Sequence, residues 1–266
     1  MQALGNNVFY RSREILECSD VQNKCELTLA LWRDWQERAV NTQTTPTEDK
    51  LLALGRPEYP KLVNPNDLQK RSFYTTQGRL IFMHAVAHIE FNAINLACDA
   101  VYRFQGLPDE YYGDWIRVAA DEVHHFRLVK KYLEQFNCCY GDYPAHNGLW
   151  DMAIKTANDH LARLAIVPRV LEARGLDVTP GMITKLKEAG DQLAADILET
   201  IYEEEISHVA AGSRWFRFLC EQRQLNPDEH FLVLLKKYLG DLPRGPFNLV
   251  ARRQAGFTEK ELAMIG

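Results

Sequence analysis

Apolar residues recur at helical spacing along most of the chain from residue 75 onward, whereas strictly alternating apolar and polar stretches are few. The pattern predicts an all-α fold. Gly175 is typical of a helix C-terminus, and Thr179 with Pro180 is typical of the start of a short helix that ends near Gly190. Four long helices are expected, over about 75–104, 109–136, 149–174 and 191–222.

The segments on either side of these helices have a different character. Residues 1–74 contain one helical pattern, at about 20–40, followed by a polar stretch and a proline-rich stretch that should be extended. Residues 226–266 contain helix-start signals at Asn226-Pro227 and at Thr258 with Glu261. We therefore expect an N-terminal helix and extended cover (1–74), a four-helix bundle (75–225), and C-terminal helices and a tail that pack on it (226–266).

Composition and charge narrow the function classes. The 266 residues carry a formal net charge of −5, which gives no electrostatic support for nucleic-acid binding. The six cysteines form no C-x-x-C pair, the N-terminus has no apolar signal core, and no stretch reaches the length of a membrane span. These features predict a reduced, cytoplasmic protein with no membrane or nucleic-acid partner.

Carboxylates and imidazoles occur on largely apolar helix faces, where an ionised group is costly unless it is paired or binds a metal. The segment ADEVHHF places a glutamate and a histidine three residues apart, and EEEISHV repeats the spacing. The other two long helices each carry one glutamate on a similar face, although Arg169 makes the face in the third helix less apolar. The six candidate ligands are Glu90, Glu122, His125, Glu172, Glu205 and His208.

The spacing of these residues repeats along the chain. Glu90 precedes Glu122 by 32 residues, and Glu172 precedes Glu205 by 33. One glutamate from each of two helices and Glu-x-x-His from each of two others form the ligand set of a dinuclear carboxylate site in a four-helix bundle. Residues three apart point the same way on a helix, and four carboxylates balance two divalent cations. The mixed ligand set suits two iron ions, or manganese.

Four residues near the candidate ligands could support the site. Asp121 and Glu204 each lie four residues before a ligand histidine, where they could fix its tautomer or simply face solvent. Tyr202 lies one turn before Glu205 and is either a redox tyrosine or a core residue. Pro168, four residues before Glu172, should kink the third helix beside a ligand.

Several segments resemble a known family. They include HAVAHIEFNAINLACDAVYRF, VAADEVHHF, YGDYPAHNGLWD, VPRVLEARGLDVTP and EEEISHVAAGSRWF. As a set they are similar to an uncharacterised bacterial ferritin-like family, domain-of-unknown-function family 455, over most of the chain. The resemblance implies a ferritin-like four-helix bundle and supplies no reaction. The LEARGLD and HVAAG segments also resemble, more distantly, a diiron tRNA hydroxylase, which is a likeness of the site and not of the substrate.

These observations favour a dinuclear non-haem iron oxidase or hydroxylase that uses O2 on a small organic molecule. The ligand set alone leaves open a ferroxidase or iron-handling protein, a dimanganese catalase-like protein, and a metal-free helical scaffold. The electron donor, the substrate and the choice between monomer and homodimer are not fixed by the sequence.

Overall fold

The structure, a computed structural model, describes residues 6–45, 54–69 and 71–265. In these ranges the fold is all-helical: no β-strand occurs, and only two isolated bridges are present. This confirms the all-α fold class. Packing divides the chain into two compact units, residues 1–150 and 151–266, which we describe separately. The three-part division expected from the sequence stays a prediction.

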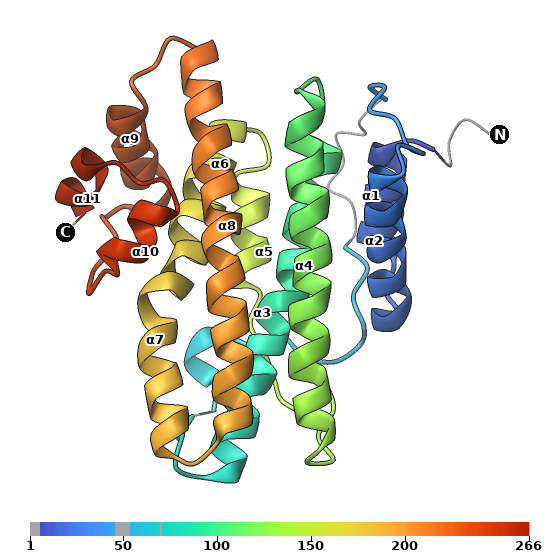
Figure 1. Ribbon diagram of the computed structural model, residues 1–266, viewed down its shortest axis with the longest axis vertical. Coiled ribbons are helices and arrows are strands. Elements are labelled where there is room, and N and C mark those ends of the chain that lie inside the picture. The colour runs from blue at the N-terminus through green and yellow to red at the C-terminus, as the bar shows by residue number, and fades with distance from the viewer. Residues whose placement is uncertain (1–5, 46–53, 70, 266) are drawn as a thin grey trace. The chain divides into compact units, whose positions relative to one another are not determined.

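The first unit is built on two long antiparallel helices that lie side by side (Figure 1). The polar side chains of Asn7, Asp20 and Thr75 each cap the helix that follows. The first helix packs on the third, and the second on the fourth, so the N-terminal helices cover the long pair. The elements are α1 (Val8–Glu17), α2 (Val21–Gln36), the short η1 (Pro65–Asp67), α3 (Thr76–Arg103) and α4 (Asp109–Glu134).

Helix α3 is apolar on nearly every side. It is long and apolar enough to cross a membrane, but 78% of its most apolar window is buried inside the protein. Such burial is consistent with the central helix of a soluble protein. Among its buried residues are polar ones, including His84, His88, Glu90 and Asn95. Buried polar groups need partners, so α3 is where chemistry or specific packing is expected.

In the second unit, helices α7 and α8 lie side by side, and the three C-terminal helices group beside them (Figure 1). Asn226 caps the ninth helix, and Thr258 forms the expected capping box with Glu261 at the last one. The elements are α5 (Gly148–Lys155, across the boundary between the units), α6 (His160–Ile166), η2 (Val167–Glu172), α7 (Ala173–Glu188), α8 (Gln192–Gln222), α9 (Pro227–Leu239), α10 (Leu249–Gln254) and α11 (Glu259–Ile265).

The third predicted helix differs from the prediction. It is divided into α5 and α6, followed by a π-helical segment, η2, which begins one residue before Pro168. Pro168 has no N–H to donate, so a local change of helix type at this point follows from its chemistry. The expected stop at Gly175 and the new start at Pro180 are wrong, because α7 continues from Ala173 to Glu188.

A side chain from the C-terminal segment explains why α7 continues through Pro180. A proline in a helix leaves the carbonyl four residues earlier without its usual donor. That carbonyl belongs to Leu176, and it accepts a hydrogen bond from Asn248 Nδ2 at 3.2 Å. Asn248 and Arg252 also bond the buried carboxylate of Asp177. The C-terminal segment thus satisfies the polar groups of α7 that the proline disturbs.

Candidate metal centre

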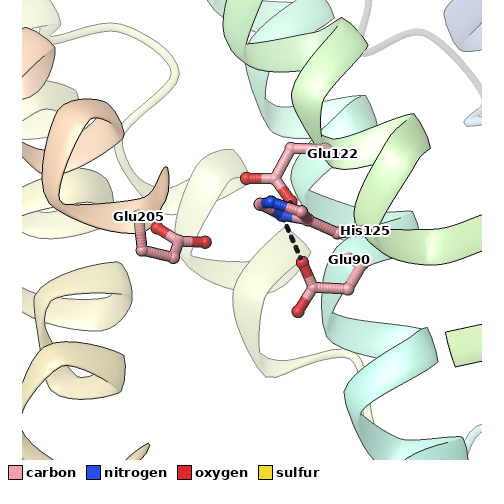
Figure 2. A group of neighbouring side chains, drawn as sticks. All are labelled: Glu90, Glu122, His125 and Glu205. Carbon is pink, nitrogen blue, oxygen red and sulfur yellow. Dashed lines mark hydrogen bonds and ion pairs between the residues drawn. The ribbon is translucent and has the colours of Figure 1, made fainter. Parts of the chain in front are cut away.

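Glu90, Glu122 and His125 converge in the interior of the first unit (Figure 2). Glu90 comes from α3, whereas Glu122 and His125 are one turn apart on α4. His125 Nδ1 lies 3.2 Å from Glu90 Oε2 and 3.4 Å from Glu122 Oε2. All three side chains are buried, with at most 4% of each exposed. The α3–α4 pair therefore brings together three of the predicted ligands, as the sequence pattern indicated.

The apolar neighbours on α3 and α4 force this convergence. Around Glu122 the buried residues Trp115, Val118, Ala119, Phe126 and Val129 turn this face of α4 into the core. A carboxylate on that face must enter the core with them. The unit thus concentrates negative charge in a place where water cannot screen it.

Electrostatics in this cluster follow from burial and proximity. Burial, and then the charge of Glu122, raise the pKa of Glu90 to about 8, against the opposing effect of His125. Burial lowers the pKa of His125, but hydrogen bonds and charge from Glu122 and Glu90 outweigh it and raise that pKa to about 11. Protons therefore bind tightly here. A metal cation that displaced these protons would neutralise the charge of the same carboxylates.

The cluster could hold a metal ion. Its ligand atoms, one per residue, lie within 4.8 Å of one another, a spacing that a single ion can bridge. Carboxylate oxygen and imidazole nitrogen form a hard-to-intermediate donor set that suits iron, manganese or zinc better than a thiolate-seeking metal. The donor chemistry of these residues therefore fits the predicted cofactor, although it does not choose the metal.

The second unit carries the other three predicted ligands on two neighbouring elements. Glu205 and His208 are one turn apart on α8, with His208 Nδ1 3.6 Å from Glu205 Oε2. The His208 side chain is fully buried, and 14% of the Glu205 side chain is exposed. Glu172 is the last residue of η2, which packs against α8. Figure 2 draws the side chain of Glu205 on α8.

Close packing sets the distance between η2 and α8. A Cβ atom placed on Gly212 would lie 2.5 Å from Cβ and Cγ of Pro168, so only glycine permits this approach. Gly212 is one turn after His208, and Pro168 is four residues before Glu172. The close contact therefore lies next to the turns that carry two of the predicted ligands.

Arg169 anchors η2 to α8 and to α11. This structural role was not predicted from the sequence. The guanidinium is fully buried, pairs with Glu261 of α11, and donates from Nε to Ser213 Oγ on α8 at 3.2 Å. The rings of Phe216, Phe231 and Phe257 lie around it, with centroids 4.2–4.8 Å from Cζ. No sequence signal links Arg169 to Glu261, which is 92 residues away.

The residues beside the predicted ligands are placed as follows. Asp121 accepts a hydrogen bond from Arg117 at 3.0 Å, one turn earlier on α4. The Tyr202 hydroxyl accepts a hydrogen bond from Asn248 Nδ2 at 2.9 Å. These contacts tie Asp121 to its own helix and Tyr202 to the C-terminal segment. A tautomer-fixing role for Asp121 or Glu204, and a redox role for Tyr202, stay predictions.

A family model and a curated relative both match this chain over nearly its whole length. Residues 17–263 match the model of the family described as "Protein of unknown function (DUF455)". An uncharacterized protein of Haemophilus influenzae is 42% identical over 277 residues, an alignment that covers all of this chain and 96% of the relative. No solved structure matches the chain.

Proposed function

The chain belongs to the DUF455 family, and we propose that it is a dinuclear non-haem iron oxidase or hydroxylase that uses O2 on an organic substrate. The observation that carries the proposal is the buried group of Glu90, Glu122 and His125 in the first unit. The second unit repeats its chemistry with Glu172, Glu205 and His208. In the proposed architecture, a ferritin-like four-helix bundle, α3, α4, α8 and the η2–α7 helix would contribute these six residues to one pair of metal ions.

Charge balance supports two metal ions in place of one. The four carboxylates carry four negative charges once all of them are ionised, which two divalent cations neutralise and one does not. The histidines would contribute one neutral nitrogen each, and His125 must first lose the proton that its raised pKa lets it hold. The chemistry that bound iron would supply is the activation of O2, which protein side chains alone cannot perform.

The chain's own residues then have defined tasks. Glu90, Glu122 and His125 would hold metal, because their side chains meet from two different helices. The buried residues that flank Glu122 keep water out of the site, which strengthens every charge interaction inside it. Burial of His125 fixes the orientation of its ring.

Elemental analysis of protein purified without chelators tests this proposal. We expect about two irons per chain in the wild type. Because the proposal assigns both halves to one centre, Glu122→Gln and Glu205→Gln should each lower the content of both ions. Glu134→Gln, which changes an exposed carboxylate on α4 that pairs with Lys130, should change neither.

The outcomes separate the alternatives. If each variant lost only one of the two ions, the halves would be independent sites. Manganese in place of iron would move the proposal to peroxide chemistry. Absence of bound metal, even after anaerobic reconstitution with ferrous iron, would refute it. With iron bound, the reduced protein should consume O2 in a single turnover.

A further inference from the structure

A cleft in the first unit is lined by none of the residues assigned to the proposed metal centre. Its volume is about 690 Å³, within the range of small-molecule sites. Two segments line it, the extended chain at Tyr59, Lys61 and Val63, and the loop 140–144 that follows α4. The walls are therefore rich in tyrosine rings and contain one ammonium group.

Backbone pairing holds the two walls in place. The N–H of Val63 donates to the Ala145 carbonyl at 2.8 Å, and the N–H of Ala145 donates to the Lys61 carbonyl at 3.0 Å. Gly141, at φ +118°, passes so close to Tyr59 that a Cβ on it would lie 3.1 Å from the tyrosine Cβ. A cleft whose walls are already joined loses little conformational entropy when a ligand binds.

A buried histidine holds the loop that forms one wall of the cleft. His84 is fully buried and accepts a hydrogen bond from the Gly141 N–H at Nε2, 2.8 Å away. Its ring stacks on Tyr140 and meets Tyr143 edge-on, with both centroids 5.5 Å away. These contacts fix the planes of two of the three tyrosine rings that line the cleft.

Charge in the cleft indicates what it would bind. Lys61 is exposed and its Nζ lies 5.7 Å from the ring centroid of Tyr59, and the described residues give it no ion pair. The carboxylate of Asp142 already accepts the Cys139 N–H at 2.7 Å. Asp142 keeps its negative charge, with one oxygen held by its own loop. The positive charge of the cleft is the Lys61 ammonium, which lies beside aromatic faces that favour a flat ring.

The cleft also adjoins the turns that carry the cluster. Tyr140 is hydrogen-bonded through its hydroxyl to His88 Nδ1 at 2.9 Å. Its ring packs on Phe91 and Phe126, with centroids 5.5 and 5.2 Å away. Phe91 follows Glu90 in sequence and Phe126 follows His125, so a single layer of rings joins the cleft to those turns.

We propose that this cleft binds an aromatic anion, with the ring between the tyrosines and the negative group at Lys61. The proposal rests on the proposed function, for which it names the substrate class. A carboxylate and a phosphate would both satisfy Lys61, so the shared feature is an anionic group on a flat ring.

Calorimetric titration of the full-length protein tests the proposal with 2-naphthoate as the probe. Two comparison probes each lack one feature: cyclohexanecarboxylate has no aromatic ring, and 2-naphthylmethylamine has the opposite charge. We expect 2-naphthoate to bind at least fivefold more tightly than either. Lys61→Gln should weaken its binding about five- to tenfold, as expected for loss of one charge-assisted contact. Lys131→Gln, at an exposed lysine outside the cleft, should leave binding unchanged.

Other results would overturn the proposal. Absence of 2-naphthoate binding, equal affinity for the three probes, or no effect of Lys61→Gln would each do so. A carboxylate could instead bind a metal directly, so the titration is repeated with Glu122→Gln. Unchanged affinity there supports the cleft, and loss of binding places the probe on the metal. Metal content measured on the same samples keeps the two proposals separate, because either can fail while the other holds.

Discussion

Substitution of Gly212 by alanine would test how η2 and α8 are spaced. The added methyl carbon would lie 2.5 Å from two carbons of Pro168. Non-bonded carbons normally lie about 3.5–4.0 Å apart, so the two elements must separate by about 1 Å. The proline ring is rigid, and its neighbour Arg169 is anchored in a buried ion pair, so neither side can yield easily. Overpacking of this kind costs about 1–3 kcal/mol.

A matched control isolates that cost. Alanine is a better helix former than glycine by about 1 kcal/mol, which would mask part of the strain. Gly181 lies in α7, and a Cβ there would have no atom within 4 Å. Gly181→Ala should therefore be stabilised. We expect the free energy of unfolding of Gly212→Ala, measured by urea denaturation, to lie about 1–3 kcal/mol below that of this control.

Metal content gives the second readout of the same change. Gly212 is one turn after His208, and Pro168 is four residues before Glu172. Separating η2 from α8 should therefore move Glu172 away from His208. Gly212→Ala should bind less iron than Gly181→Ala under identical reconstitution. Equal stability of the two variants would refute the packing argument. Reduced stability with unchanged iron would show that the contact supports the fold alone.

Two further predictions concern buried charges away from the cluster. Burial lowers the pKa of Lys24 to about 8, from 10.5 in the unfolded chain. Between these two pH values the unfolded chain binds more protons than the folded one. The contribution of Lys24 to the free energy of unfolding therefore rises with pH in this window. The unfolding free energy of wild type minus that of Lys24→Met should rise by about 2.5 kcal/mol from pH 7 to 10; a flat difference would contradict this. Glu261→Gln leaves the buried guanidinium of Arg169 without its charged partner and should lower the unfolding free energy by about 3 kcal/mol. Glu259→Gln, in an exposed pair, should change it little, and equal effects of the two glutamate variants would refute the role of burial.

Helical periodicity was sufficient to predict much of the first unit. Glu90, Glu122 and His125 lie on faces whose other members are apolar, and a helix with such a face turns it inward wherever it packs. Their convergence follows once two such helices lie side by side. The caps at Asn226 and Thr258 were also predictable, because capping depends on a few consecutive residues.

Helix continuity in the second unit depended on contacts that are distant in sequence. Local rules place a helix end near Gly175 and a start at Pro180, yet α7 runs through both. Asn248, 72 residues after Leu176, supplies the donor that Pro180 lacks. Propensity describes a segment by itself, and it fails where another segment satisfies the backbone group that the local sequence leaves unpaired.

Buried charges and the cleft were likewise decided by tertiary structure. A lysine or arginine in a helix is expected to face solvent, but Lys24 and Arg169 are fully buried because acceptors from distant segments surround them. The cleft forms where loop 140–144 pairs with the chain near Lys61, and neither segment has a pattern that specifies the other. The sequence alone determined which residue types lie on which helix face, because that depends on local geometry. Which distant groups meet was determined only when the elements packed.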